Sequence, residues 1–381
     1  MISRDIGIIG YGSAVYHKAP KKSALGYAAE AIRNAITKAG ILPAQIDGLV
    51  VDGSIGGDTA VSAAEYLGLT LNWTYKSSAA GAGTIMSVVN SVRAVDAGLA
   101  KVVVCVGAGA QDIQSFKGRI ANYTRAITDY LAPHGYGGPP GMHALIQKKH
   151  MRVDGTTSEQ LGRIAVDQRL NAGRNEAALL RKPLSIDDYL SAKLIADPLR
   201  LFDCVMPCSG AEAVVVAPVD SVGGGKAVRI RSACERHNHQ PDEISPISGG
   251  WVEFQERLFS AASCSHDDLN FMQCYDDFPI IAALQIEDLG FCAKGEIGRF
   301  LQTHRLTHDG NFPLNTGGGQ LSCGQAGGGA GLLSIVEAVR QLFGEGGKRQ
   351  VARAKRGLVS GYGFISYGHG LSATAAILEQ A

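Results

Sequence analysis

Apolar and polar positions along this chain predict strands and helices in turn over its first hundred residues. Residues 5–10 and 46–52 are short apolar runs, and residues 24–39 repeat apolar positions at helical spacing. A second helical pattern covers 83–95, and the β-branched run 101–107 suits a strand buried in a parallel sheet. This order predicts an α/β protein in which helices cover a central sheet.

The pattern changes between residues 112 and 198, where polar residues and helix formers dominate. We interpret this stretch as a helical insertion that covers a site. A strand pattern resumes at 211–218, and the glycine-rich stretch 221–225 is typical of a connection. The sequence thus predicts an N-terminal half over residues 1–220, with the insertion inside it, and a C-terminal half over residues 226–381.

A weak internal repeat supports two halves. Residues 88–93 (Val-Val-Asn-Ser-Val-Arg) follow a run of small residues, and residues 335–340 (Ile-Val-Glu-Ala-Val-Arg) follow the glycine-rich stretch 315–331. Each copy predicts a small-residue turn that enters a helix, followed by a strand.

Composition mainly excludes classes of function. The 381 residues suffice for two core-forming units, and 45% hydrophobic and 19% charged residues are ordinary for a soluble enzyme. With 36 basic and 35 acidic residues, nothing favours nucleic acid or an anionic membrane as a partner. No apolar stretch reaches the roughly 20 residues that span a bilayer. Residues 1–12 resemble a strand rather than a signal peptide.

The eight cysteines show neither a CxxC pair nor the spacing of zinc ligands. We therefore predict reduced thiols, no metal site and a cytoplasmic location. The basic run 348–356 is short and interrupted, and we interpret it as a solvated connection. No GxGxxG motif lies between a strand and a helix with an acidic partner downstream, so no dinucleotide cofactor is expected.

Four segments carry a resemblance to a known family through their order and spacing. They cover residues 150–160, 196–203, 284–296 and 312–319, the last reading Phe-Pro-Leu-Asn-Thr-Gly-Gly-Gly. Over nearly its whole length the chain resembles the thiolase superfamily, in its sterol-carrier or lipid-transfer branch. The resemblance implies an α/β thiolase fold: two similar βαβαβαββ halves in five layers, with an inserted helical loop domain. It also implies no bound cofactor, with coenzyme A as a substrate moiety.

The first family site is a nucleophilic cysteine in a Cys-x-x-Gly context at the N-terminus of a buried helix, where the thiol pKa is lowered. Matching on Gly81 places Ser78 at this position. A serine hydroxyl needs a strong base to become a nucleophile. Ser78 could instead be the N-cap of the following helix.

The second family site is a histidine in a Gly-His-Pro loop, and here Gln325 occupies its place after Gly324. An amide cannot act as a base near neutral pH, but it can donate a hydrogen bond to an enolate oxygen. The alternative is a structural amide that satisfies loop carbonyls. The resemblance also suggests Gly81, Gly324 and Asp276 as substrate-binding positions.

The third family site, Asn-Glu-Ala-Phe or His-Asp-Cys-Phe, reads Tyr275-Asp-Asp-Phe278 here. Tyr275 thus takes the position of the family Asn or His, in a loop after the strand pattern 270–274. Asp276 or Asp277 could instead cap the helix that begins at Pro279.

The fourth family site carries a second cysteine, which exchanges a proton with Cα. Counting back from the final strand places Tyr367 there, with Tyr362 and His369 as alternatives. Among the thiols, Cys323 lies two residues before Gln325 and is an outside candidate for a nucleophile. Packing of the tyrosines is the alternative to catalysis at these positions.

One reaction needs enolate stabilisation but no acyl-enzyme, namely retro-aldol cleavage of a β-hydroxyacyl-CoA. A base removes the β-hydroxyl proton, the Cα–Cβ bond breaks, and the enolate is protonated at Cα. Two tyrosines can supply the acid and the base. The set Ser78, Tyr275, Gln325 and Tyr367 resembles the thiolase-fold aldolases of sterol side-chain degradation. This implies a homodimeric core in complex with a small DUF35 protein (an OB-fold and a zinc ribbon), with zinc only in that partner.

Two alternatives remain open at this point. The chain could be an unconventional thiolase subunit paired with a DUF35 protein, cleaving a β-ketoacyl-CoA as in aromatic degradation, with Ser78 or Cys323 as its nucleophile. It could also be a catalytically degenerate subunit that binds acyl-CoA or lipid and acts as a scaffold.

Overall fold

Strands and helices alternate through the N-terminal half of the computed structural model, which describes residues 5–52, 55, 59–77, 79–120, 125–222, 225–366 and 369–381. They are β1 (Ile6–Ser13), α1 (Ala24–Ala39), β2 (Gly48–Asp52), α2 (Ala60–Leu67), β3 (Trp73–Ser77), α3 (Ala80–Asp96) and β4 (Val103–Gly109). The strands and helices predicted from the apolar pattern are confirmed, with ends that differ by a few residues.

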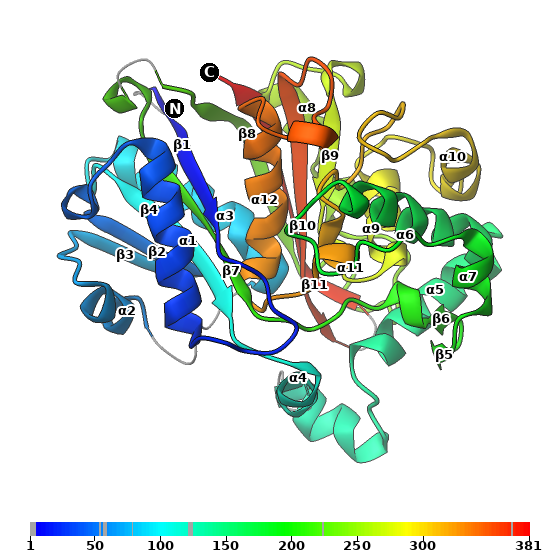
Figure 1. Cartoon of the computed structure of the whole chain (residues 1–381). Helices are drawn as coiled ribbons and strands as arrows, with labels where there is room; N and C mark the ends of the chain where they lie inside the picture. Colours follow the sequence, from blue (N-terminus) through cyan, green and yellow to red (C-terminus); the bar gives the residue numbers. More distant parts are fainter. Residues whose placement is uncertain are drawn as a thin grey trace.

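A mostly helical segment separates β4 from β7 (Gly210–Pro218). Its longer elements are α4 (Ile113–Ile120), α5 (Pro139–Asp154), α6 (Ser158–Gly173), α7 (Ile186–Ser191) and the hairpin of β5 (Leu194–Ala196) and β6 (Leu199–Arg200). This insertion lies at the right and the bottom of the molecule in Figure 1.

The C-terminal half again alternates strands and helices. It comprises β8 (Val228–His237), α8 (Gln255–Ala261), β9 (Phe271–Cys274), α9 (Pro279–Asp288), α10 (Ile297–Thr303), α11 (Gly319–Cys323), α12 (Gly329–Leu342), β10 (Arg356–Ser366) and β11 (His369–Gln380). Its last two strands form a long antiparallel pair.

In the described part of the chain, one sheet runs in the order β3-β2-β4-β7-β1-β8-β11-β10-β9. The first five strands belong to the N-terminal half and the last four to the C-terminal half. The halves meet where Ile8 of β1 pairs with Val228 of β8. Strand β2 runs parallel to β3 and β4, and β9 runs parallel to β10.

Helices α3 and α12, which carry the two copies of the internal repeat, contact each other between the halves (Figure 1). Alternate residues of each strand face different cores, as the side-chain period of two requires. Cys105 of β4 faces the central core with α3 and α12, whereas Val104 faces an outer core under α1 and α2. A third core lies under α8 and α9. The layered α/β fold expected from the resemblance is thus confirmed, with five strands of the N-terminal half and four of the C-terminal half in the described sheet.

Glycines in β10 let the first turn of α3 lie directly on this strand. A Cβ at Gly363 would stand 1.9 Å from the Ala79 carbonyl oxygen, and one at Gly361 would stand 2.7 Å from the Gly81 carbonyl oxygen. Larger residues could not be accommodated without moving backbone. The close approach holds the N-terminus of α3 against the end of β10 that leads into the β10–β11 turn.

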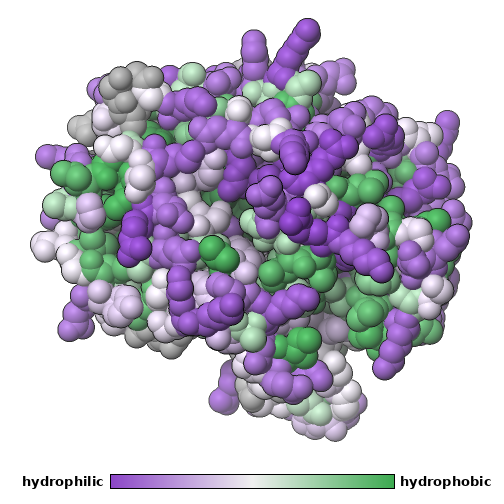
Figure 2. Space-filling view, viewed as in Figure 1, coloured by the Kyte–Doolittle hydropathy of each residue, from purple (hydrophilic) through white to green (hydrophobic). Residues whose placement is uncertain are grey.

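Hydrophilic residues cover much of the face seen in Figure 2. Apolar residues also appear over the insertion, where Leu145, Leu194, Ile195 and Leu201 are exposed. In the described ranges, no helix has the length and apolar character that crossing a membrane requires.

Arg349 is an exception within residues 348–356, the run interpreted as a solvated connection. This side chain is buried, and its guanidinium donates to Glu337 of α12 at 3.0 Å. The reason is that the glycine-rich turn after α12 folds Arg349 back toward the acidic side chain.

Candidate active site

Tyr275 lies half-buried in the turn after β9 and covers the first turn of α3. Its backbone N–H donates to the Ser360 carbonyl at 2.9 Å, and its carbonyl accepts from the Gln285 amide at 2.7 Å. A Cβ at Gly81 would stand 2.1 Å from Cε2 of the tyrosine ring. The structure therefore brings Tyr275 and Gly81 together, and only glycine leaves room for the ring.

Two of the proposed site residues, Ser78 and Tyr367, lie outside the described residues. Helix α3 has Ala79 at its N-cap, without a side-chain hydrogen bond. His369 begins β11, and its backbone pairs with Ser366 across the β10–β11 turn.

Tyr362 of β10 is buried on the outer side of the C-terminal half. Its ring stacks with Trp251 at a centroid distance of 5.9 Å. A Cβ at Gly370 would stand 2.0 Å from Cε2 of the Tyr362 ring and 2.6 Å from its hydroxyl oxygen. Tyr362 thus lies under the start of β11.

Asp276 caps α11 rather than α9, so the alternative in which Asp276 or Asp277 caps the helix at Pro279 is wrong. Its carboxylate accepts from the backbone N–H groups of Gln320 at 2.9 Å and Leu321 at 3.3 Å. The N-cap of α9 is Phe278, with no side-chain cap. Burial raises the pKa of Asp276 to about 7, against the lowering effect of these N–H donors.

This correction has a physical reason in the glycine-rich stretch. Gly319 has a φ of 59° and lies so close that a Cβ there would stand 2.0 Å from Oδ2 of Asp276. The unpaired N–H groups at the start of α11 therefore become accessible to a carboxylate from the β9 turn. As a consequence, Asp276 holds the Tyr275 turn against α11, which ends two residues before Gln325.

Gln325 is fixed through its backbone. Its N–H donates to the Met206 carbonyl at 2.8 Å, and its carbonyl accepts from the Cys208 N–H at 3.0 Å and the Gln111 amide at 2.8 Å. The half-buried side-chain amide makes no hydrogen bond with other described residues. The amide is thus held on a fixed backbone without a protein partner among the residues described.

Gly324 ends α11 and makes this geometry possible. Its φ is 101°, in the left-handed region that favours glycine, and a Cβ would stand 2.7 Å from Sγ of Cys208. Gly324 therefore packs against the Cys208 side chain, in the chain segment before β7.

Cys323 is buried, and its thiol donates to the Gly317 carbonyl at 3.2 Å. Burial raises the pKa of this thiol to about 12, and it does the same for Cys105 and Cys292. Cys274 directly precedes Tyr275, but its thiol is buried against Asn315, and burial raises its pKa as well. A thiol attacks as its thiolate, so these cysteines are poor nucleophiles near neutral pH.

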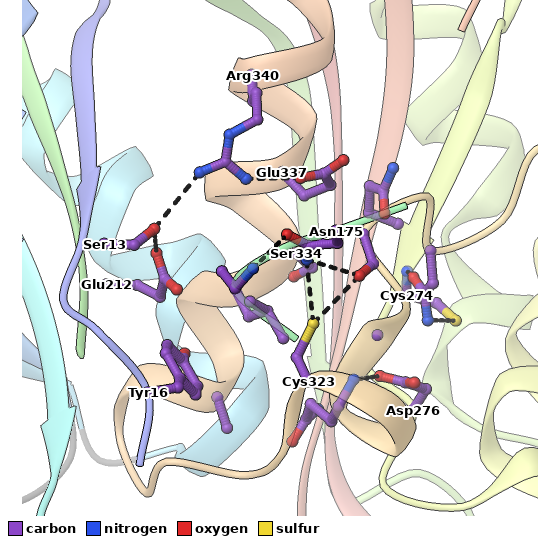
Figure 3. A pocket seen from close by; sticks show the side chains of 18 residues that line it. Ser13, Tyr16, Asn175, Glu212, Cys274, Asp276, Cys323, Ser334, Glu337 and Arg340 are labelled. Atoms are coloured by element: carbon purple, nitrogen blue, oxygen red, sulfur yellow. Dashed lines mark hydrogen bonds and ion pairs between the residues drawn. The ribbon is translucent and has the colours of Figure 1, made fainter. Parts of the chain in front are cut away.

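A recess of about 540 Å³, its opening to solvent included, lies beside the Tyr275 turn. Cys323 and Asp276 line it, together with Ser334, Glu337 and Arg340 of α12 (Figure 3). Tyr275, Gly81 and Gln325 do not line it. The recess and the site at the N-terminus of α3 are therefore neighbours rather than one cavity.

Charged side chains of this recess form two groups that Arg340 links, one around Glu212 and one around Glu337 (Figure 3). Arg340 donates to the Ser13 hydroxyl at 3.5 Å, and that hydroxyl donates to Glu212 at 2.6 Å. Burial raises the pKa of Glu212 to about 7. Burial would also raise that of Glu337, but Arg349 and Arg340 outweigh it and hold the pKa at about 2.

His143 of α5 is a buried residue of this region that no motif singles out. Its ring stacks on Phe278 at a centroid distance of 4.0 Å, and Nδ1 lies 2.9 Å from the Pro139 carbonyl oxygen. Its Nε2 lies 3.9 Å from Oδ2 of Asp277. The only sequence signal is a histidine in the second turn of a helix that Pro139 begins in the insertion.

Burial lowers the pKa of His143 to about 4 and raises that of Asp277 to about 8. Both shifts favour the neutral form of the group, because a low-dielectric surrounding penalises charge. Within the described residues, no group of three or more His, Cys, Asp or Glu side chains is arranged to hold a metal ion.

Comparisons with known proteins agree with this architecture. The family model "Thiolase C-terminal domain-like" matches residues 234–380. The 17-hydroxy-3-oxo-4-pregnene-20-carboxyl-CoA lyase of Mycobacterium tuberculosis is 30% identical over 90% of this chain and 93% of its own. The benzoylsuccinyl-CoA thiolase subunit BbsB of Thauera aromatica is 29% identical over 68% of this chain and 67% of its own. The solved structure of an Ltp2-ChsH2(DUF35) aldolase covers 98% of this chain and 97% of that chain, with a TM-score of 0.87 and 27% identity.

Proposed function

The chain belongs to the thiolase superfamily, and from this premise we propose that it cleaves a carbon–carbon bond of an acyl-CoA. The reaction proposed is retro-aldol cleavage of a β-hydroxyacyl-CoA through an enolate. The observation that carries the proposal is the packing of the Tyr275 ring on Gly81, at the helix N-terminus where the family places its acyl-carrying cysteine. The lyase and aldolase names of two similar proteins support the same reaction class.

In the proposed reaction, one tyrosine takes the proton of the β-hydroxyl group, and the Cα–Cβ bond breaks as the new carbonyl forms. The electron pair of that bond becomes the enolate of the acyl-CoA, which the other tyrosine protonates at Cα. Tyr275 and Tyr367 are the residues proposed for these two transfers. A tyrosine ordinarily titrates near 10, so proton transfer depends on its surroundings lowering that value.

The enolate oxygen needs hydrogen-bond donors aimed at the developing charge. The side-chain amide of Gln325 is proposed as one donor, because its backbone is fixed while the amide has no partner among the described residues. The N-terminus of α3, under the Tyr275 ring, is proposed to contribute positive potential to the reacting group. Ser78 and His369 complete the proposed set, while Asp276 holds the Tyr275 turn in place.

A partner protein and a coenzyme A substrate form part of this proposal. The similar aldolase was solved as an Ltp2-ChsH2(DUF35) assembly. We propose a DUF35 partner, carrying the zinc, on a homodimeric core in the cytoplasm. The insertion exposes the aliphatic residues Leu145, Leu194, Ile195 and Leu201, and we propose that they contribute to this binding surface.

The test is turnover of β-hydroxyacyl-CoA substrates by the protein, alone and with a purified DUF35 protein of the proposed kind, combined with mass spectrometry of the chain. We expect a carbonyl product and an acyl-CoA, with no acyl adduct on the protein. The double variant Tyr275→Phe, Tyr367→Phe should lose at least about 100-fold in kcat while it stays folded. Tyr66→Phe, at an exposed tyrosine of α2, is the matched control. Undiminished turnover by the double variant would refute the tyrosine mechanism.

A second candidate function is thiolytic cleavage of a β-ketoacyl-CoA, which the similarity to the benzoylsuccinyl-CoA thiolase subunit favours. It requires an acyl group on Ser78 or Cys323. The same mass spectrometry decides, because an adduct on either residue would establish covalent catalysis. Absence of turnover with every partner and substrate class would leave the scaffold alternative.

A further inference from the structure

A buried glutamine interrupts the apolar sequence of α9, the helix behind the Tyr275 turn. Residues 279–286 read Pro-Ile-Ile-Ala-Ala-Leu-Gln-Ile, and the side chain of Gln285 is fully buried. Gln285 lies in the segment 284–296 that carries part of the family resemblance, but it belongs to none of the four family sites. Burying an amide is unfavourable unless its polar atoms find hydrogen-bond partners. The contacts of this amide therefore indicate its role.

Three hydrogen bonds give the Gln285 amide a single orientation. Its Nε2 donates to the Tyr275 carbonyl at 2.7 Å and to the Ile281 carbonyl at 2.9 Å. Both carbonyl oxygens can only accept, so the nitrogen of the amide has to face them. The Oε1 atom then faces β10 and accepts from the Ser360 hydroxyl at 2.7 Å. Both protons of the amide are thus used, and a flipped amide would set oxygen against oxygen.

These contacts close a ring of hydrogen bonds through the Tyr275 backbone. Strand β9 pairs with β10 up to Cys274, which lies opposite Ser360. The N–H of Tyr275 still donates to the Ser360 carbonyl at 2.9 Å, but the chain turns away from the sheet at this residue. Gln285 supplies the partner for the Tyr275 carbonyl, and the Ser360 hydroxyl joins Gln285 back to β10. The ring thus extends the strand pairing by one residue through side chains.

Holding both peptide groups of Tyr275 fixes the direction of its side chain. The backbone has two soft torsions at each residue, and the bonds to the N–H and to the carbonyl restrain the peptide planes on both sides of Cα. The Cα–Cβ bond therefore points to one place, which is the first turn of α3 at Gly81. The residue after Ser360 acts on the same turn, because a Cβ at Gly361 would stand 2.7 Å from the Gly81 carbonyl oxygen. Two consecutive residues of β10 thus hold the aromatic ring and the helix start against each other.

We propose that Gln285 and Ser360 are positioning residues, which set the place of the Tyr275 ring over the start of α3. The inference rests on the retro-aldol function proposed above, in which Tyr275 transfers a proton. Both residues are buried beneath the turn and act through Tyr275. Proton transfer requires the donor and acceptor atoms to come within hydrogen-bond distance, so a displaced ring slows the reaction step. Loss of the hydrogen-bond ring should therefore lower kcat and leave KM nearly unchanged.

Steady-state kinetics of four variants test the proposal. Gln285→Leu keeps an apolar side chain in α9 but makes no hydrogen bond, and it should lower kcat about tenfold or more with KM within about threefold. Ser360→Ala should lower kcat less, by about threefold, and Ser360→Thr, which keeps the hydroxyl, should restore most of it. The double variant Gln285→Leu, Ser360→Ala should be no slower than Gln285→Leu alone, because both changes open the same ring of hydrogen bonds. If the role of Gln285 were only to fill space, leucine would preserve kcat.

The matched control is Gln341→Leu. Gln341 is a fully buried glutamine of α12, and its amide donates to the Arg349 carbonyl at 2.9 Å and the Thr316 hydroxyl at 3.2 Å. This variant should lower the midpoint of thermal unfolding about as much as Gln285→Leu, while its kcat stays within about twofold of the wild type. Wild-type kcat in Gln285→Leu, or an equal loss of kcat in both variants, would overturn the proposal. If Gln285→Leu does not fold, the comparison of Ser360→Ala with Ser360→Thr decides.

Hydrogen exchange of the Tyr275 turn gives a readout that does not depend on turnover. Exchange at the backbone N–H of Tyr275 should be at least about tenfold faster in Gln285→Leu than in the wild type, and unchanged in Gln341→Leu. Unchanged exchange in Gln285→Leu would overturn the positioning role. Absence of cleavage by the wild type, together with this faster exchange, would refute the proposed function and support the role of Gln285 in placing the ring.

Discussion

Gly81→Ala is the sharpest test of the site geometry, because a single methyl group reaches the Tyr275 ring. The added Cβ would stand 2.1 Å from Cε2, 2.5 Å from Cδ2 and 2.6 Å from Cζ of that ring. Carbon atoms in contact are separated by about 3.5 Å. The ring must therefore move by about 1.4 Å, or the first turn of α3 must shift away from β10.

The structure predicts a larger effect on activity than on stability. Alanine in a helical turn gains about 0.5–1 kcal/mol over glycine, whereas overpacking costs about 1–3 kcal/mol. The net loss in the free energy of unfolding should then be at most about 2.5 kcal/mol. A displacement of about 1 Å in a catalytic group can cost about 100-fold in rate. We therefore expect kcat to fall about 100-fold in a protein that remains folded.

The assay compares kcat for release of the carbonyl product with the midpoint of thermal unfolding. Gly118→Ala is the matched control, since this exposed helical glycine of α4 has open space at its Cβ position. It should keep wild-type turnover and gain about 0.5–1 kcal/mol in stability, since nothing opposes its Cβ. A Gly81→Ala protein with undiminished kcat would refute the reasoning, because it would show that the position of the Tyr275 ring does not matter to the reaction.

Three further outcomes follow from the buried groups of the recess. Iodoacetamide treatment and Cys323→Ala should each leave turnover within about twofold of the wild type. The Cys323 thiol, with a pKa of about 12, is almost wholly protonated at pH 7 and so a poor nucleophile. Loss of activity in either experiment would favour the covalent, thiolase-type mechanism. Glu337→Gln should destabilise by about 3–5 kcal/mol at pH 7, by leaving Arg349 buried without its partner. The folded pKa of Glu337, about 2, lies below its usual 4.5, so the wild type loses this stabilisation as pH falls from 4.5 toward 2. Urea unfolding should therefore show a smaller loss of stability for Glu337→Gln at pH 3 than at pH 7. An equal loss at both pH values would count against the pairing. The pKa of Glu212 is raised instead, to about 7, so the wild type loses stability as pH rises from 4.5 through 7. Glu212→Gln should therefore be more stable than the wild type by about 1–3 kcal/mol at pH 8 and equally stable at pH 4. Equal changes in the free energy of unfolding at both pH values would contradict this sign.

The order of strands and helices could be predicted because it depends on neighbouring residues. The helix over residues 24–39 buries one face, and the strand within 101–107 is buried on both faces. The spacing of apolar residues along each segment indicates this burial directly. The internal repeat also predicted two similar halves, and α3 and α12 do meet between them. The family resemblance then supplied the order of layers, which periodicity alone does not contain.

The candidate site was only partly predictable. Gly81, Tyr275 and Gln325 were found by position within motifs, and the structure shows the first two in contact. The sequence offered Asp276 as a cap of the helix at Pro279, but its carboxylate caps α11 instead. A carboxylate just before a helix that begins with proline fits the local capping pattern, and the sequence does not show that a more distant helix start lies closer. The two hydrogen bonds that decide the matter join residues 44 and 45 positions apart.

What the sequence alone determined is therefore the set of elements, the fold class and the motif positions, since these follow from neighbouring residues and from resemblance. Tertiary structure alone decided that His143 faces Asp277, that Arg349 is buried against Glu337, and that Asp276 caps α11. Each of these contacts joins residues distant in sequence or residues whose local pattern indicates solvent. Burial then sets their protonation, because the cost of a charge depends on every group packed around it.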